Sequence, residues 1–252
     1  AGRLLLNLAQ NEYFVRETLT DDVRVYQLHP LLREFLRNRA AHALPDAVGA
    51  AELRRAAALL HGAGHIEDAV SLLVECGDWS EVSRIATQQA DTMLGQGRSE
   101  TLCGWMELLP RQLLETDPRL LQIYAATRVH ASPRSARRLF EQAYEGLRHS
   151  GDTHGVLQCC RGIINAIILE FDDLAALDRW IAVLAELLGA GAAPAGADPG
   201  AAETLIRALL LRDAGNVELE KWLDYAAQAA GAQSRSDVTA ELALGRAMAA
   251  VL

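Results

Sequence analysis

The sequence predicts an all-α fold, in which stacked helix hairpins follow a short N-terminal segment that contains a β-hairpin. Three observations predict this fold. Beyond about residue 50, apolar residues recur at the three- and four-residue spacing of amphipathic helices. Short turns that carry helix-starting residues separate these segments. The turns themselves recur at nearly constant intervals.

Helix-starting residues define the predicted helices. Asp117-Pro118 and Ser132-Pro133 each place a capping side chain before a proline that suits the first helical position. Asp78 opens "DWSE", which has the pattern of a capping box. Further candidate caps are Asp152, Asp172, Asn216 and Asp237. The predicted helices cover roughly residues 50–61, 66–76, 78–94, 98–108, 117–130, 133–149, 153–170, 173–189, 201–213, 217–230 and 237–252.

The turn motifs repeat along the chain. "GHIEDA" starts at Gly64, "GRSETL" at Gly97 and "ASPRSA" at Ala131, which gives separations of 33 and 34 residues. This is close to the period of tetratricopeptide-type helix hairpins, and two later motifs continue the series at about 40 and 44 residues. Because one hairpin cannot bury its apolar face alone, such hairpins stack into a solenoid, an α-α superhelix with a concave side. The Gly-, Ala- and Pro-rich stretch near 189–200 is predicted to be a flexible loop between hairpins.

The first forty residues differ from the remainder. "YFVRETL", "TDDV" and "RVYQL" predict a strand, a polar turn and a second strand. Pro30 suits the first position of the following helix. The apolar residues of that helix keep helical spacing: Leu31, Leu32, Phe35 and Leu36. A helix end ("LLLNLAQ"), a two-stranded wing and a further helix form the pattern of a winged-helix remnant. We therefore predict the C-terminal part of a winged-helix domain over residues 1–42 and a helical-repeat sensor or interaction domain over residues 43–252.

Composition argues against several classes of function. The net charge of −9 and the pI of about 5.3 argue against a broad phosphate-binding surface, so we expect no direct DNA contact. The longest apolar run, "GIINAIIL", is far shorter than the roughly 18 residues of a membrane span, and no signal peptide opens the chain. Four cysteines without a C-x-x-C pair indicate buried thiols in a reducing cytoplasm. Because the chain lacks an initiator methionine and ends within a helical pattern, we expect a fragment of a longer cytoplasmic protein.

Two stretches carry a resemblance to a known family. "NEYFVRETLTDDVRVYQLHPLLREFLRNR" resembles the end of the winged-helix segment of the MalT-like regulators, which are ATP-dependent transcription activators of the STAND class with a LuxR-type DNA-binding end. The "GDW" motif, the "W-x-x-LLP" around Trp105 and the "DPRLL" at Asp117 resemble the start of that family's helical sensor region. The match runs from about Leu4 to Ala125, and beyond Ala131 the resemblance is to generic helical repeats.

The residues that such a regulator uses for ATP are not in this sequence. No G-x-x-x-x-G-K-[ST] loop occurs, and the only lysine, Lys221, follows a glutamate. We therefore expect no cofactor in this chain, with ATP bound only in a separate domain of the parent protein.

Enzymatic motifs are also weak, and we predict that the chain is not an enzyme. "DDLAA" at Asp172 suggests a magnesium-binding pair, but two aspartates at a helix start are better explained as caps. His61 and His65 have the four-residue spacing of a metal-binding pair, but the glycines between them predict a turn with two exposed histidines.

A polar stripe is the best candidate for a binding site. Gln158, Arg161 and Asn165 are spaced at i, i+3 and i+7 on an otherwise isoleucine-rich helix, so they share one face. Tyr124 and Arg128, on the first helix of the preceding hairpin, are expected to lie alongside them on the concave side. Together these side chains suit hydroxyl- or carboxylate-bearing ligands. The alternative is a solvated face or a hydrogen-bonded contact to the next hairpin.

The predicted function is signal sensing. The family resemblance implies that an inducer binds the helical region and that the protein, with ATP bound elsewhere, then self-associates and activates transcription. The expected partner is a small-molecule effector or a regulatory protein, with possible self-association and no membrane. The alternative is a tetratricopeptide-type adaptor that binds a protein or peptide.

Overall fold

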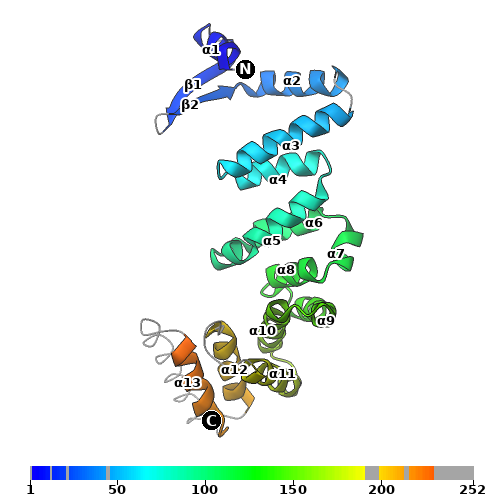
Figure 1. Ribbon diagram of the computed structural model, residues 1–252, viewed down its shortest axis with the longest axis vertical. Coiled ribbons are helices and arrows are strands. Elements are labelled where there is room, and N and C mark those ends of the chain that lie inside the picture. The colour runs from blue at the N-terminus through cyan, green and yellow to red at the C-terminus, as the bar shows by residue number, and fades with distance from the viewer. Residues whose placement is uncertain are drawn as a thin grey trace. The chain divides into compact units, whose positions relative to one another are not determined.

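A computed structural model describes residues 2–11, 13–20, 23–43, 46–190, 199–212 and 216–229. This part of the chain is mostly helical, and its one sheet has two antiparallel strands (Figure 1). The chain divides into two compact units, residues 1–78 and 79–252. The first unit therefore includes a helix hairpin that lies beyond the predicted winged-helix remnant.

The first unit contains the predicted β-hairpin between helices. Its elements are α1 (Gly2–Gln10), β1 (Val15–Thr20), β2 (Val23–Leu28), α2 (Pro30–Ala43), α3 (Asp46–Gly62) and α4 (Ile66–Glu75). β1 and β2 pair in register from Val15 opposite Leu28 to Thr20 opposite Val23. α1 packs against β1, and the side chain of Val15 is buried. Both predicted strands and the helix that starts at Pro30 are thus confirmed.

The second unit is helical throughout its described residues. Its elements are α5 (Trp79–Gly95), α6 (Ser99–Leu108), α7 (Arg111–Thr116), α8 (Pro118–Arg128), α9 (Pro133–Ser150), α10 (Thr153–Glu170), the 3-10 helix η1 (Leu174–Ala176), α11 (Leu177–Ala190), α12 (Pro199–Arg212) and α13 (Leu219–Ala229). The predicted helices that fall on described residues are all present. The short α7 was not predicted, and the segment predicted as a helix from residue 173 begins with η1. The helix predicted over 237–252 lies outside the described residues.

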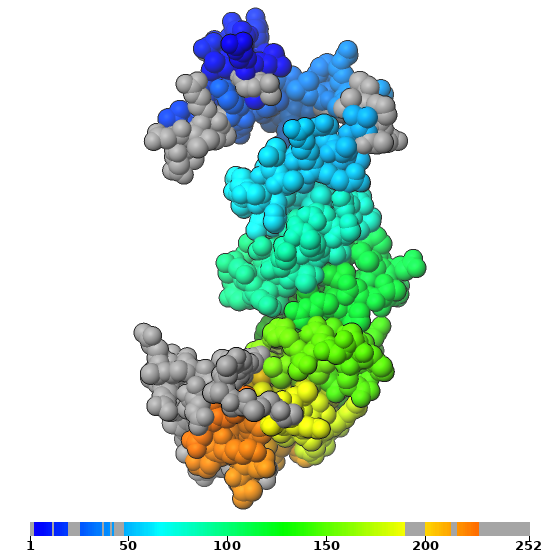
Figure 2. All heavy atoms as spheres, viewed as in Figure 1, coloured from blue at the N-terminus to red at the C-terminus, as the bar shows by residue number. Residues whose placement is uncertain are grey.

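The helices of the second unit pack in a regular order. We name α5, α8, α10 and α12 the first helices, and α6, α9, α11 and α13 the second helices. Each first helix packs against the second helix that follows it, and each second helix packs against the next first helix. Consecutive first helices also contact one another: α5 with α8, α8 with α10, and α10 with α12. In the space-filling view the colours of this unit follow one another in chain order, so each helix lies beside its near neighbours in sequence (Figure 2).

The core of this unit is centred on α10. Its buried residues include Val156, Cys159, Cys160, Ile163, Ile164 and Ile167. On α11, the Trp180 ring meets the Tyr144 ring of α9 edge to face, with centroids 5.1 Å apart. The Phe140 ring of α9 packs directly against the backbone of α10 at Gly162, where a Cβ would collide with the ring. The isoleucine-rich helix thus supplies much of the core of this unit.

Two predicted caps are formed by aspartates. The Asp117 carboxylate accepts hydrogen bonds from the backbone N–H groups of Arg119 and Leu120 at the start of α8. The Asp152 carboxylate accepts from the Gly155 N–H at the start of α10, at 2.9 Å. These bonds satisfy donors that the helix cannot pair internally, so they set where α8 and α10 begin.

Two other predicted caps are wrong in detail. The Ser132 side chain makes no capping hydrogen bond to α9. At the start of η1, Asp173 rather than Asp172 accepts from a backbone N–H, that of Ala175. Asp172 instead forms an ion pair with Arg134 across to α9, at 2.8 Å. Because the Arg134 guanidinium binds the Asp172 carboxylate, the cap of η1 is formed by Asp173.

Glycine 162 provides a direct test of the α9–α10 packing. We expect Gly162→Ala to destabilise the protein by about 1–3 kcal/mol, because the new methyl group displaces the Phe140 ring from a packed core. Gly104→Ala is the matched control, since Gly104 is helical and a Cβ there meets nothing within 4 Å. Because alanine has a greater helix propensity than glycine, Gly104→Ala should leave the free energy of unfolding unchanged or raise it by up to about 1 kcal/mol. Urea unfolding measures both, and equal effects would contradict the packing described.

The two adjacent buried thiols predict an alkaline instability. Burial raises the pKa of Cys159 and Cys160 to about 12, from an ordinary value of 9.0. Above about pH 9 the unfolded chain loses protons that the folded chain keeps, so folding stability falls as pH rises. The slope is about 1.4 kcal/mol per pH unit for each thiol between roughly pH 9 and 12. The free energy of unfolding should therefore fall less between pH 8 and pH 10 in a Cys159→Ala/Cys160→Ala variant than in the native protein. An equal fall in the two proteins would show that these thiols ionise freely in the fold.

Candidate functional site

The polar stripe lies at the junction between α10 and α12. Gln158, Arg161 and Asn165 are half-buried on α10. Arg161 Nη1 donates to Gln158 Oε1 at 3.3 Å, and Arg207 Nη1 of α12 donates to Asn165 Oδ1 at 3.4 Å. The Arg161 guanidinium also lies against Gly200 in the first turn of α12, where a Cβ would collide with Nη2. The stripe therefore contacts the next hairpin and keeps part of its polar surface accessible.

Tyr124 and Arg128 form a second group, which faces α6. Arg128 Nη1 donates to the Tyr124 hydroxyl at 2.9 Å and to Glu107 Oε1 at 3.1 Å. The Arg128 guanidinium also lies 5.2 Å from the centroid of the Tyr124 ring. The side chains of Arg128 and Glu107 are 31% and 55% exposed, so their ion pair contributes at most about 1 kcal/mol. This group links a first helix to the preceding second helix.

The two groups lie on different sides of the first helices. When α8 and α10 are aligned by their capping aspartates, Tyr124 corresponds to Cys159 and Arg128 to Ile163, and both of these α10 residues are fully buried. The stripe instead occupies the side of α10 that corresponds to Ala126 of α8. We call this side, which faces away from the second helices, the outer side of the first helices. The structure thus brings Tyr124 together with Arg128 but does not place this pair beside the stripe.

The outer side of α8 carries two polar residues that the sequence reasoning missed. Arg119 and Gln122 are three residues apart, and Gln122 is only 7% exposed. Among the described residues, Arg119 Nη1 and Gln122 Oε1 are buried side-chain atoms without a hydrogen-bond partner. The signal in the sequence is a glutamine within the mostly apolar segment "RLLQIYA", three residues after its arginine, so that the two share one side of a helix.

Neither candidate metal site is formed. In the part of the chain that the structure describes, no three His, Cys, Asp or Glu side chains lie close enough to hold a metal ion. Asp172 and Asp173 are engaged separately, one with Arg134 and the other with a backbone N–H. His61 lies in the last turn of α3, and the exposed His65 follows in the turn.

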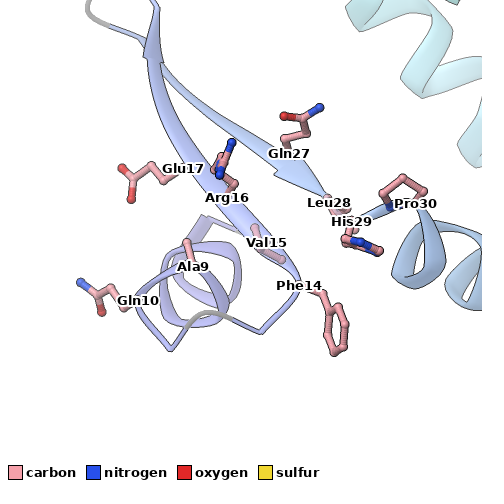
Figure 3. Close-up of a pocket in the computed structure, with 10 residues that line it drawn as sticks. All are labelled: Ala9, Gln10, Phe14, Val15, Arg16, Glu17, Gln27, Leu28, His29 and Pro30. Carbon is pink, nitrogen blue, oxygen red and sulfur yellow. The ribbon is translucent and has the colours of Figure 1, made fainter.

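A depression in the first unit is lined by both polar and apolar residues. It lies between α1, the β-hairpin and the start of α2 (Figure 3). The Phe14 ring meets His29 edge to face at 5.7 Å, and His29 Nδ1 accepts from the Leu31 N–H. In this view Gln10 and Glu17 project on the opposite side from these two rings. The His29 imidazole therefore caps α2 here.

Comparison with known proteins gives no assignment: the chain matches no protein-family model, no curated protein and no solved structure. Among the described helices, none is both long enough and apolar enough to cross a membrane.

Proposed function

We propose that this chain is the signal-sensing helical-repeat region of a multidomain, cytoplasmic transcription activator of the MalT-like kind. A small-molecule effector or a regulatory protein binds the outer side of the first helices and controls the ATP-dependent self-association of the parent protein. The observation that carries this proposal is the packing order of the second unit, which supplies a row of first helices with polar side chains on one side.

The packing order supports a tetratricopeptide-like solenoid. In such arrays each repeat contacts only its neighbours, and the described helices of the second unit follow this rule, with contacts within a hairpin and to the next one. The resemblance to the MalT-like sensor region, given by "GDW", "W-x-x-LLP" and "DPRLL", covers the first of these hairpins and reaches into α8 of the second.

The position of the stripe supports a role in signalling. Asn165 of α10 and Arg207 of α12 belong to consecutive hairpins and are joined by one long hydrogen bond. A ligand that engages both side chains favours one relative arrangement of the two hairpins over another. Such a ligand shifts the population toward the arrangement that it binds more tightly, and this shift is the physical basis of an effector response.

The cysteines support a reducing compartment. The four cysteines of the chain are all free thiols, which is the usual state in the cytoplasm.

One observation favours the alternative of a protein-binding adaptor. Phe171 ends α10 in a left-handed conformation, with φ of 48°, and is 72% exposed, close to the exposed Leu169. A strained, exposed aromatic residue next to a second apolar one is the kind of anchor that protein partners use. The reading frame of the parent gene distinguishes the two functions, since an activator requires a phosphate-binding loop upstream and a helix-turn-helix downstream.

The chain is expected not to hydrolyse ATP. It has no phosphate-binding loop, and its one lysine, Lys221, lies with its ammonium group 4.8 Å from the centroid of the Trp222 ring. Purified chain incubated with ATP and Mg²⁺ should release phosphate no faster than buffer. Turnover that a single substitution within the chain abolishes would refute this expectation.

Two single substitutions test the binding site. We expect Arg161→Ala and Asn165→Ala to lose the thermal shift that an effector causes, with melting temperatures of the free protein within a few degrees of the native value. The screen uses metabolites and candidate partner peptides. Arg148→Ala on α9 is the control, because Arg148 forms an exposed ion pair with Glu145 of its own helix. A large fall in stability in both variants, without a specific loss of binding, would make the stripe structural.

A further inference from the structure

The outer side of α8 holds a donor and an acceptor that the described fold leaves unused. Gln122 is 93% buried, and its Oε1 atom has no hydrogen-bond donor among the described residues. One helical turn earlier, Arg119 Nη1 is buried and has no acceptor there. The two residues are separated by three positions, so their side chains leave the same side of the helix.

Arg119 also differs from other arginines of the second unit in its surroundings. Arg128, Arg134 and Arg212 each pair with a carboxylate, those of Glu107, Asp172 and Asp178. No carboxylate pairs with Arg119 among the described residues.

Arg119 and Gln122 lie on the stripe side of α8. Together with Ala126 they are spaced at i, i+3 and i+7, so they share the side of α8 that corresponds to the stripe side of α10. On α10 this side contacts α12, the next first helix, and α8 likewise packs against its own next first helix, α10. We therefore place Arg119 and Gln122 toward the contact between α8 and α10.

An unpaired polar pair in this position is costly for stability. A buried amide oxygen without a donor, and a buried guanidinium nitrogen without an acceptor, each lose their interaction with water and gain none in return. Buried polar atoms in native proteins are nearly all paired, so each of these two atoms needs a partner that the described residues do not supply. Gln122 keeps 7% of its surface exposed, so the residue is not wholly enclosed, although its Oε1 atom is buried.

We propose that Arg119 and Gln122 form a ligand subsite between α8 and α10 for a small carboxylate that bears a hydroxyl or amino group on the adjacent carbon. The carboxylate accepts from Arg119 Nη1, because a guanidinium matches an anionic acceptor in both charge and geometry. The neighbouring hydroxyl or amino group donates to Gln122 Oε1, which can only accept. The subsite rests on the proposed function, since it extends the sensor site from the α10–α12 junction to the α8–α10 junction.

The first experiment measures what Gln122 contributes to stability. Gln122→Met keeps the shape of the side chain and removes the unpaired oxygen, so its melting temperature should equal or exceed that of the native protein. Thr204→Val is the matched control, because Thr204 is 2% exposed and its hydroxyl donates to the Gly200 carbonyl at 2.8 Å. This control should lower the melting temperature. If Gln122→Met lowers it as well, the amide has a partner within the fold and the subsite is refuted.

The second experiment measures binding with defined probes. L-lactate, L-malate, L-serine and L-glutamine are titrated into the native chain, and the melting temperature is followed. At least one should raise it, and the same probe should have no effect on Gln122→Met or Arg119→Met. Propionate, which lacks the donor, and methyl L-lactate, which lacks the charge, should shift the native protein less than L-lactate does if L-lactate binds. No shift with any probe, or equal shifts in the native protein and both variants, overturns the subsite.

Failure of the subsite and failure of the proposed function give different results. Suppose that a ligand of another class, such as a neutral oligosaccharide or a peptide, binds the native protein and Gln122→Met equally. If the same ligand does not bind Asn165→Ala, only the subsite is refuted. Binding that is unchanged in Asn165→Ala, Arg161→Ala and Gln122→Met alike refutes both.

Discussion

The burial of α10 between its neighbouring helices is the interaction on which the second unit depends. Ile163, Ile164 and Ile167 are almost wholly removed from water, and α10 packs against α8, α9, α11 and α12. A helix with apolar residues on so much of its surface cannot be stable as part of an isolated hairpin, so it requires a hairpin on either side. The close approach of Gly162 to the Phe140 ring sets how deeply α10 sits against α9. Everything that α10 presents on its remaining side, including Arg161 and Asn165, is positioned by this packing.

Much of the fold could be predicted from the sequence, because its signals are local. Asp117 and Asp152 start α8 and α10 through hydrogen bonds within one helical turn. Pro30 starts α2 because its fixed φ and missing N–H suit the first helical position. The failures involve competition between distant residues. Asp172 was predicted as a cap, but Arg134, 38 residues earlier, binds its carboxylate. Helix α7 is six residues long, which is too short to show a helical period.

The candidate site was less predictable, because it depends on the phase of each helix. The three stripe residues share one side of α10, as their spacing requires, since a relation within one helix is fixed by 100° per residue. The relation between helices is not fixed in this way, and Tyr124 and Arg128 project toward Glu107 on the far side of α8. Aligning α8 with α10 by their capping aspartates gives the correct relative rotation of the two helices, because the structure shows that both aspartates form caps. Gln122 was overlooked because the search relied on polar residues that recur at helical spacing, and a single glutamine in an apolar segment shows no such recurrence.

The neighbour-only packing of the second unit has a consequence for how it loses structure. Because the main contacts in its described part join helices that are near neighbours in sequence, a hairpin at one end can open while α9 and α10 remain folded. Protection of backbone amides against hydrogen exchange is then graded, highest in the middle helices and lower toward α5 and α13, rather than uniform. Heating follows the same gradient, so the midpoint of a melting curve averages several openings and depends on which spectroscopic probe is used.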